Sequence, residues 1–399
     1  MDPVDELIAQ AEAGVSLFAD RDVLHHSHIP DAIQHRDAEQ TQVTQSLLPI
    51  IRGSRPSNLL VYGKPGTGKT LVVRKVILKI QEGVKRRNFP IKLVYTNSKV
   101  ETTLYGLLVS FGRQLGMDDK ELPWTGISIS ALFTRILSKI ERDSINVVLV
   151  IDEIDFLAKI VSKGSKDILY HVTRANERLQ SGSLTFVGIS NNLTFKDILD
   201  PRVISSLSEE EIVFPNYTIE QLRTIILERI KVAFNSGVVE ESASNLCATL
   251  AGREHGDARR AIDLIRVAGE IAERDQSTSV IGDHIHTAFE KIEEDKETTA
   301  IKSYPLHEKL VLAAVMRANG STTGGIYNTY KGLCKGVRQK ELSQRRITQM
   351  LSEIEMSGLI SGRLVHQGIH GNTKKFKLTI SPDLVRDTLR QDATFEEMV

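Results

Sequence analysis

The stretch that decides the fold is LLVYGKPGTGKT, residues 59–70, in which a short apolar run leads directly into a glycine-rich loop. Residues 63–70 match the pattern G-x-x-x-x-G-K-[ST] in full, and residues 71–80 have helical character. Glycines let backbone N–H groups turn inward around an anion, and the following helix adds its positive N-terminal end. The stretch therefore predicts a strand, a phosphate-binding loop and a helix.

The loop assigns expected roles to its residues. Lys69 would reach the β- and γ-phosphates of a bound nucleotide, and the Thr70 hydroxyl would hold Mg²⁺. The other positions expected to contact the nucleotide are Gly63, Gly66, Thr67 and Gly68. A purely structural glycine turn is the alternative, but the flanking strand and helix favour phosphate binding.

A second apolar run, residues 147–151, ends in the carboxylates Asp152 and Glu153. At the end of a buried strand, Asp152 can hold the Mg²⁺ that Thr70 also contacts. Glu153 is then placed to orient or polarise the attacking water. A helix N-terminus that carries acidic residues is the alternative reading of the pair.

Further short apolar runs at 92–95, 184–189 and 211–214 predict more strands, and helical patterns separate them. This alternation is expected of a parallel sheet covered on both faces. Asn191 follows one of these runs, where it is either a γ-phosphate sensor or a turn residue. A further helix is expected over 37–51.

After residue 217 the strand signals stop. Helices are expected over residues 219–234, 241–252, 257–274 and 282–291, followed by a charged linker over 293–299. Two more helices are expected over 304–316 and 342–356, and two strands over 359–364 and 374–380. Helices followed by a β-hairpin are typical of a winged helix.

Overall charge predicts no partner, because 51 basic residues balance 51 acidic residues in a chain of 399. Its distribution is uneven: residues 331–377 hold ten basic and three acidic residues, a net charge of +7. Such a basic end suits a polyanion. No apolar run approaches the roughly 18 residues of a membrane span, and no secretory signal is seen. Two cysteines that lie far apart in the sequence, Cys247 and Cys334, make a disulfide framework unlikely, so a cytoplasmic protein is expected.

The helix expected over 342–356 is apolar on one side, and Arg345, Arg346 and Gln349 lie outside that stripe. A helix of this kind suits docking in the major groove of duplex DNA. The hairpin after it carries Arg363, Lys374 and Lys375, which can neutralise phosphates along a neighbouring groove. A winged helix that binds protein and has a merely solvated basic face is the alternative.

Four segments in this order, followed by the winged-helix pattern, resemble the AAA+ ATPases. More closely, they resemble the archaeal replication initiators related to eukaryotic origin-recognition subunit one and cell-division-control protein six. The segments are PSNLLVYG at 56–63, DEID at 152–155, DPRVISSL at 200–207 and GDARRAIDL at 256–264. The resemblance covers about residues 20–399.

The resemblance implies an α/β fold with an AAA+ P-loop core over residues 1–216, a helical lid over 217–297 and a winged-helix DNA-binding domain over 298–399. It implies a slow, switch-like ATPase that uses ATP, ADP and Mg²⁺ and binds duplex DNA at replication origins. Expected partners are the minichromosome maintenance helicase and other initiator subunits, at the nucleoid. The rival class is an AAA+ signalling or transposition-helper ATPase whose winged helix binds protein.

Individual positions also match the family. Asn191 matches its first nucleotide sensor and Arg259 its second, although the neighbouring Arg260 is an alternative to Arg259. Tyr217 and Arg229 match lid positions that contact bound ATP.

Three matches concern surfaces beyond the phosphates. Arg202 matches a position that either presents an arginine to a neighbour's nucleotide or forms an ordinary surface ion pair. Residues 29–37 resemble a strip that covers the adenine, and residues 101–130 fall where initiators carry an insertion that touches DNA.

Overall fold

The chain forms two compact units, Met1–Ile285 and His286–Val399. The computed structural model describes residues 16–25, 28–85, 90–101, 103–161, 168–192, 201–207, 210–253, 256–366, 372–392 and 394–395. Within these residues, no helix combines the length and the apolar character needed to cross a membrane.

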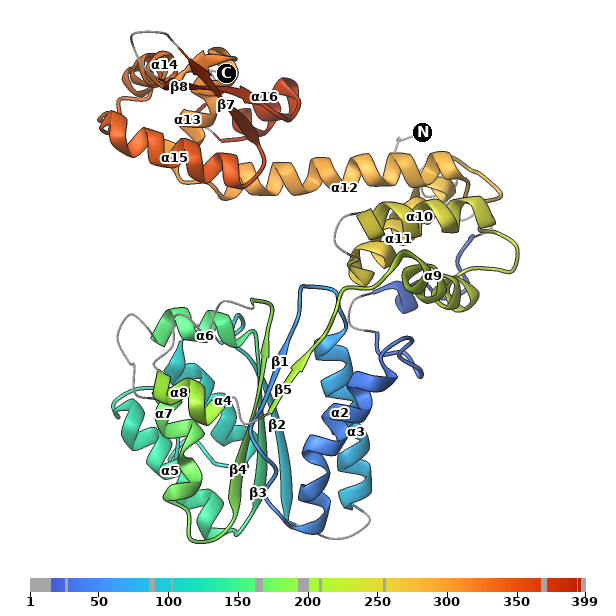
Figure 1. The fold of residues 1–399 in the computed structure, drawn as a ribbon, viewed down its shortest axis with the longest axis vertical. Helices are drawn as coiled ribbons and strands as arrows, with labels where there is room; N and C mark the ends of the chain where they lie inside the picture. Colours follow the sequence, from blue (N-terminus) through green and yellow to red (C-terminus); the bar gives the residue numbers. More distant parts are fainter. Residues whose placement is uncertain are drawn as a thin grey trace, which may run out of the picture. The chain divides into compact units, whose positions relative to one another are not determined.

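The first unit contains a five-stranded parallel sheet with the strand order β2-β3-β4-β1-β5 (Figure 1). The expected apolar runs all form strands, each with bounds within about two residues of the expectation. They are β1 (Leu59–Tyr62), β2 (Ile91–Asn97), β3 (Asn146–Asp152), β4 (Ser183–Ser190) and β5 (Glu210–Val213). The central strands β1 and β4 are buried throughout, which explains their nearly continuous apolar sequence.

Helices cover both faces of this sheet (Figure 1). One face packs against α2 (Asp37–Leu47) and α3 (Lys69–Lys85). The helix expected over 37–51 ends early, because Pro49 opens a short 3-10 helix, η2 (Leu48–Arg52). The other face carries α4 (Leu104–Gln114), α5 (Ile129–Arg142), α6 (Ile154–Val161), α7 (Ile168–Thr173), η3 (Ala175–Glu177) and α8 (Pro201–Leu207).

Parallel register brings the carboxyl ends of the strands to one edge. Tyr62 of β1 pairs with Ser190 of β4, and Asp152 of β3 pairs with Ile189. The phosphate loop (residues 63–70), Asp152 and Asn191 therefore leave the sheet at the same edge. In open α/β sheets this edge is where ligands bind.

The lid is a helical domain formed by α9 (Ile219–Ala233), α10 (Glu241–Arg253) and α11 (Ala258–Arg274). Residues 16–24, which include η1 (Arg21–Leu24), also belong to it. The amides of Ala19 and Asp20 donate to the carbonyl of Ala233 at 2.9 and 3.2 Å, and the Phe18 and Phe234 rings lie 4.5 Å apart. The N-terminal segment is thus part of the lid, whereas α2 belongs to the core.

The second unit has a winged-helix arrangement in which helices pack against a three-stranded antiparallel sheet, order β6-β8-β7. Its elements are α13 (Leu306–Arg317), β6 (Ser321–Thr322), α14 (Thr323–Gly336), α15 (Gln344–Met356), β7 (Ile360–His366), β8 (Asn372–Leu378) and α16 (Pro382–Arg390). The fold class expected from the sequence is confirmed in all three parts: parallel-sheet core, helical lid and winged helix.

One expectation for the carboxyl half needs correction, and two helices were not expected. The charged run at 293–299, expected to be a linker, is helical, because α12 (Gly282–Ser303) has no glycine or proline after its first residue. The sequence patterns also missed α14 and α16. The first turn of α14 looks like a loop, Thr-Gly-Gly, but the Thr322 side chain accepts from the Gly325 amide and caps the helix.

Candidate functional site

The phosphate loop holds two glycines in the left-handed region, Gly66 at φ 73° and Gly68 at φ 89°. Space also requires them to be glycine. A Cβ atom on Gly66 would lie 1.6 Å from Asp257 of the lid, and one on Gly68 would lie 2.9 Å from the Tyr217 hydroxyl. The loop therefore has both the backbone geometry of an anion cradle and direct contact with the lid.

Lys69 is the first residue of α3, and it is 4% exposed. Its ammonium donates to the carbonyls of Gly63 and Lys64 at 2.7 Å each. Burial, with a smaller contribution from Arg259, lowers the pKa of Lys69 to about 8, although nearby carboxylates act in the opposite direction. The ammonium also donates to the Thr67 hydroxyl at 3.5 Å. A buried ammonium whose hydrogen-bond acceptors are neutral is well suited to an incoming phosphate.

Asp152 is buried, and one of its oxygens accepts two hydrogen bonds. The Thr70 hydroxyl donates at 2.9 Å and the Tyr95 hydroxyl at 2.7 Å. Burial and the Asp152 carboxylate raise the pKa of Tyr95, so it stays a donor at neutral pH. A hydroxyl and a carboxylate side by side at the end of the loop are hard oxygen donors of the kind that Mg²⁺ takes. The residues fit the metal expected from the sequence.

Glu153 follows Asp152 with φ 55°, an uncommon backbone conformation for a residue with a side chain. Its carboxylate forms an ion pair at 2.5 Å with Lys99, whose side chain is 61% exposed. The expected water-activating carboxylate is therefore engaged by a lysine from the loop that follows β2. Sequence reasoning did not find Lys99 or Tyr95, because nothing in the local pattern links β2 to the end of β3.

Asn191 leaves the sheet beside this cluster, and its backbone N–H donates to the Asp155 carboxylate at 3.4 Å. Arg202 lies elsewhere: it is exposed on α8, with its guanidinium 5.4 Å from the centre of the Tyr170 ring. Arg202 does not line the nucleotide-sized pocket described next. Asp200, which precedes it in the matched segment, lies outside the described residues.

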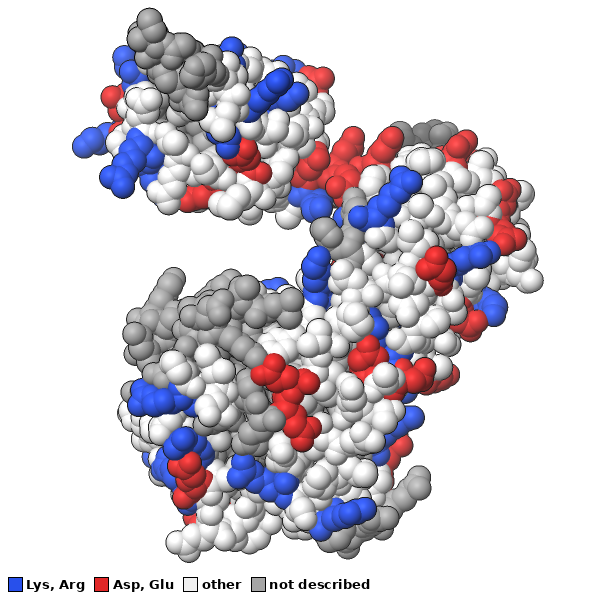
Figure 2. All heavy atoms as spheres, viewed as in Figure 1, with Lys and Arg blue, Asp and Glu red and all other residues white. Residues whose placement is uncertain are grey.

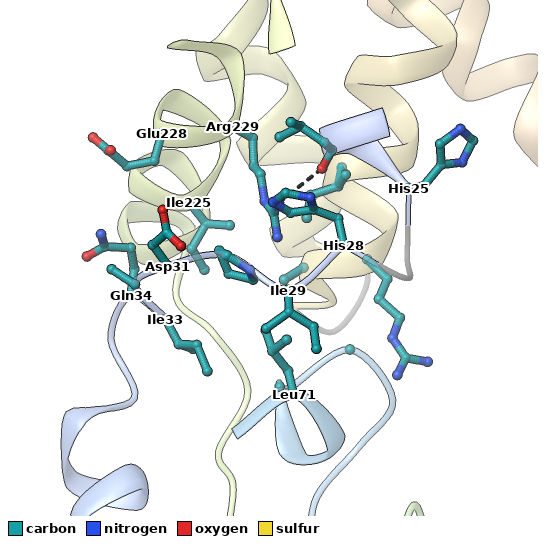
Figure 3. A pocket seen from close by; sticks show the side chains of 18 of the residues that line it. His25, His28, Ile29, Asp31, Ile33, Gln34, Leu71, Ile225, Glu228 and Arg229 are labelled. Atoms are coloured by element: carbon teal, nitrogen blue, oxygen red, sulfur yellow. Dashed lines mark hydrogen bonds between the residues drawn. The ribbon is translucent and has the colours of Figure 1, made fainter. Parts of the chain in front are cut away.

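A pocket of about 440 Å³ opens between the phosphate loop, the lid and the N-terminal connector, residues 28–36 (Figure 3). Apolar side chains such as Ile29, Leu71 and Ile225 line one part of it, and the phosphate loop forms another part. This volume and mixed lining are typical of small-ligand sites. Of the strip expected to cover an adenine, residues 29–37, the first six residues, 29–34, line this pocket.

The lid residues expected to contact nucleotide meet in this pocket. Tyr217, Arg229 and Arg259 all line it, whereas Arg260 does not. Arg229 donates to the Val23 carbonyl at 3.0 Å (Figure 3), and burial lowers its pKa. The Arg259 guanidinium is close enough to Lys69 to affect its pKa. Of the two arginines left open by the sequence, geometry favours Arg259.

The winged helix presents one basic helix face. Four apolar residues of α15 are buried, namely Ile347, Met350, Leu351 and Ile354, as expected. Arg345, Arg346 and Gln349 are exposed on the remaining surface. Gln349 donates to Glu353 at 3.0 Å, and Arg346 lies 3.8 Å from the same carboxylate. Figure 2 shows lysine and arginine side chains gathered at the end of this unit that carries α14 and α15.

The wing is formed by β7 and β8, and their register sorts its basic residues. Arg363 is paired with Lys375, and Ser361 with Lys377, so these residues share one face. Lys374 belongs to the other face, where its ammonium forms an ion pair at 2.5 Å with Glu355 of α15. The sequence analysis singled out Lys374 but not Lys377, which is exposed. The wing tip, residues 367–371, lies outside the described residues.

Models of three protein-family domains match the chain in the same order. They are an AAA domain at residues 51–194, a Cdc6 AAA+ ATPase-type lid domain at 223–290 and a CDC6 C-terminal winged helix domain at 299–388. A protein of Cenarchaeum symbiosum (strain A) called "ORC1-type DNA replication protein" is 61% identical over 398 residues, which cover 100% of this chain and 97% of that protein. The chain belongs to the ORC1-type DNA replication proteins.

Other ORC1-type proteins extend this match. A relative from Pyrococcus furiosus is 39% identical over 405 residues, covering 99% of this chain and 95% of that protein. Among solved structures, the Aeropyrum pernix ORC1 protein in complex with DNA is 39% identical with a TM-score of 0.84, covering 96% of this chain and 99% of that chain. As an ORC1-type protein with an AAA domain, the chain is an ATPase.

The pH dependence of nucleotide binding follows from Lys69 of this ORC1-type site. Only the protonated ammonium attracts phosphate, and its pKa in the free protein is about 8. Affinity for ATP is therefore expected to be constant below that pH and to fall by up to about tenfold per pH unit above it, because binding must then take up a proton. Titrations with saturating Mg²⁺ from about pH 7 to 9.5 measure this. Equal affinity across the range would contradict it.

Proposed function

We propose that this protein binds duplex DNA at replication origins under the control of ATP and helps to load the replicative helicase. The observation that carries the proposal is the combination in one chain of a complete phosphate site, a lid that contacts it and an exposed basic helix in a winged helix. Family membership and the DNA complex of the Aeropyrum pernix relative support it.

In the proposed nucleotide site, residues 1–216 and 217–297 together bind ATP or ADP. Lys69 and the loop N–H groups would hold the phosphates. Thr70 and Asp152 would hold Mg²⁺, which when bound supplies positive charge beside the phosphates. Glu153 orients the attacking water, and Asn191 and Arg259 contact the γ-phosphate. Turnover is slow, because Glu153 must first leave its ion pair with Lys99. Such slow turnover suits a switch.

DNA binding falls to residues 298–399. Arg345, Arg346 and Gln349 enter the major groove, while Arg363, Lys375 and Lys377 follow the backbone. Lys374 forms an ion pair with Glu355, so it contributes to DNA binding indirectly, by holding the wing against α15. The segment 101–130 adds a second contact, in which the Arg113 guanidinium lies 4.0 Å from the centre of the Trp124 ring and Trp124 is 62% exposed.

The expected partners follow from this function. The protein would be cytoplasmic and associated with the nucleoid. Bound at an origin there, it would recruit the minichromosome maintenance helicase and other initiator subunits. Arg202, exposed on α8, would then meet the nucleotide of a neighbouring subunit. A signalling or transposition-helper ATPase, whose winged helix binds protein, is less consistent with membership of a family of DNA replication proteins.

The proposal is tested by fluorescence anisotropy with labelled duplexes. Genome-wide mapping of the protein on its own chromosome supplies the candidate origin sequence, and a scrambled duplex of equal length is the control. We expect tighter binding to the mapped duplex than to the scrambled one, and a difference between the ATP-bound and nucleotide-free protein. Failure to bind either duplex would favour the protein-binding alternative.

Basic residues of the helix and of the wing are expected to act differently on DNA. Arg345→Ala or Arg346→Ala should reduce the difference in affinity between the origin duplex and the scrambled duplex, since a bidentate base contact contributes about 1–3 kcal/mol of discrimination. Lys375→Ala combined with Lys377→Ala should weaken binding to both duplexes equally. It should also reduce the slope of log affinity against log salt concentration by up to about two units. A salt series on each variant measures both effects.

The matched control for the wing is Lys374→Ala. Its ammonium is paired with Glu355, so its removal should change the salt slope less than removal of Lys375 does. If the arginine variants lost equal affinity for both duplexes, α15 would contact phosphates only.

A further inference from the structure

Arg36 has the largest of the fully buried side chains in the described residues, with 2% of its surface exposed. A buried guanidinium must have its N–H groups satisfied, or its desolvation is costly. Its ion-pair partner is Glu39, one helical turn further along α2, at 3.1 Å. The remaining donors are directed to backbone carbonyls.

These carbonyls belong to three different segments. Nε donates to Thr67 of the phosphate loop at 2.9 Å, one terminal nitrogen donates to His35 at 3.3 Å, and the other donates to Pro215 at 2.6 Å. The guanidinium also lies 3.8 Å from the centre of the Tyr217 ring. One side chain thus joins the loop that binds phosphate to the segment that leads into the lid.

The position of Arg36 in the chain makes this contact important. Residues 16–24 belong to the lid and α2 belongs to the core, so the chain crosses between them twice. The first crossing is the N-terminal connector, residues 28–36, and the second is the C-terminal connector, residues 214–218. Arg36 ends the first crossing and is hydrogen-bonded to the second.

The bond to Thr67 also affects the anion cradle. In a trans peptide the carbonyl and the following N–H point in opposite directions. While the Thr67 carbonyl faces Arg36, the Gly68 N–H points to the opposite side of the loop. Arg36 therefore orients a donor of the cradle and both core–lid connectors from the same planar group.

We propose that Arg36 is a positioning residue that couples the phosphate loop to the lid, so that a nucleotide bound in the loop changes the angle of the lid. This inference rests on the proposed nucleotide site. Arg36 does not line the pocket, and it acts through Thr67, Pro215 and Tyr217.

The test compares the wild type with Arg36→Lys, which keeps the charge but lacks the planar fork, and with Arg36→Gln. Exposed Arg52 of η2 gives the matched control, Arg52→Lys. Spin labels at Glu82→Cys on α3 and Ser236→Cys on the lid, both exposed positions, report the core–lid distance, since both natural cysteines are buried. ATP affinity is measured on the same proteins, and circular dichroism establishes that each variant is folded.

We expect ATP to bind Arg36→Lys about tenfold more weakly, from the loss of directed charged hydrogen bonds. At saturating ATP the label distance should shift in the wild type and in Arg52→Lys but stay at its nucleotide-free value in both Arg36 variants. A wild-type shift in a folded Arg36 variant would overturn the proposal, as would a wild type that binds ATP without any shift. Failure of the wild type to bind ATP would instead refute the proposed nucleotide site.

Discussion

Lys69→Ala is expected to remove measurable ATP binding while the protein stays folded. The change deletes the buried cation of the phosphate loop, and hydrogen bonds from a charged donor to phosphate contribute about 1.5–3 kcal/mol each. Two such bonds lost correspond to a weakening of roughly 100-fold or more. The fold should survive, because the lowered pKa of Lys69 indicates that its burial as a cation is unfavourable.

Isothermal titration calorimetry with ATP measures the effect. Lys64→Ala is the matched control: its side chain is exposed in the same loop, and its carbonyl, which accepts from Lys69, is retained. Lys64→Ala should bind ATP as the wild type does. Unchanged affinity in Lys69→Ala would show that the loop does not hold phosphate.

Glu153→Gln is expected to bind ATP normally but to hydrolyse it about 10²–10⁴-fold more slowly, the usual contribution of a positioned general base. The amide can hydrogen-bond a water molecule but cannot take up its proton. Single-turnover hydrolysis with bound ATP measures the step directly, without the influence of product release.

The same substitution also breaks the ion pair with Lys99, so a second variant is needed to separate the two effects. Lys99→Met removes the ion pair and keeps the carboxylate. We expect it to hydrolyse ATP at least as fast as the wild type. A wild-type rate in Glu153→Gln would mean that another residue activates the water, and slow hydrolysis in both variants would mean that the ion pair itself is required.

Local patterns were sufficient to predict the phosphate loop and the strands of the parallel sheet. The glycine loop and the buried apolar strands each depend on neighbouring residues, and parallel register then brings Asp152 and Asn191 to the phosphate loop. The helix α14 was missed because its first turn reads Thr-Gly-Gly, and its cap is visible only in three dimensions.

Contacts between distant segments could not be predicted in the same way. Arg36 and Pro215 are 179 positions apart, and Tyr95 reaches Asp152 across 57 positions. Lys374 looked equivalent to Lys375 in the sequence, but a strand alternates its side chains, and Glu355 lies on the Lys374 side. In each case the chemistry of the residue was readable, whereas its partner depended on the tertiary fold.

The two connectors between core and lid limit how the lid can move. A domain attached by a single connecting segment can rotate about several axes. A domain attached by two segments can rotate mainly about the line that joins the two points of attachment. Residues 28–36 and 214–218 therefore define a single hinge axis, which passes close to Arg36. We expect nucleotide exchange to rotate the lid relative to the core about this one axis. In a protein lacking the first 36 residues, the lid would be attached by residues 214–218 alone and could rotate about other axes as well.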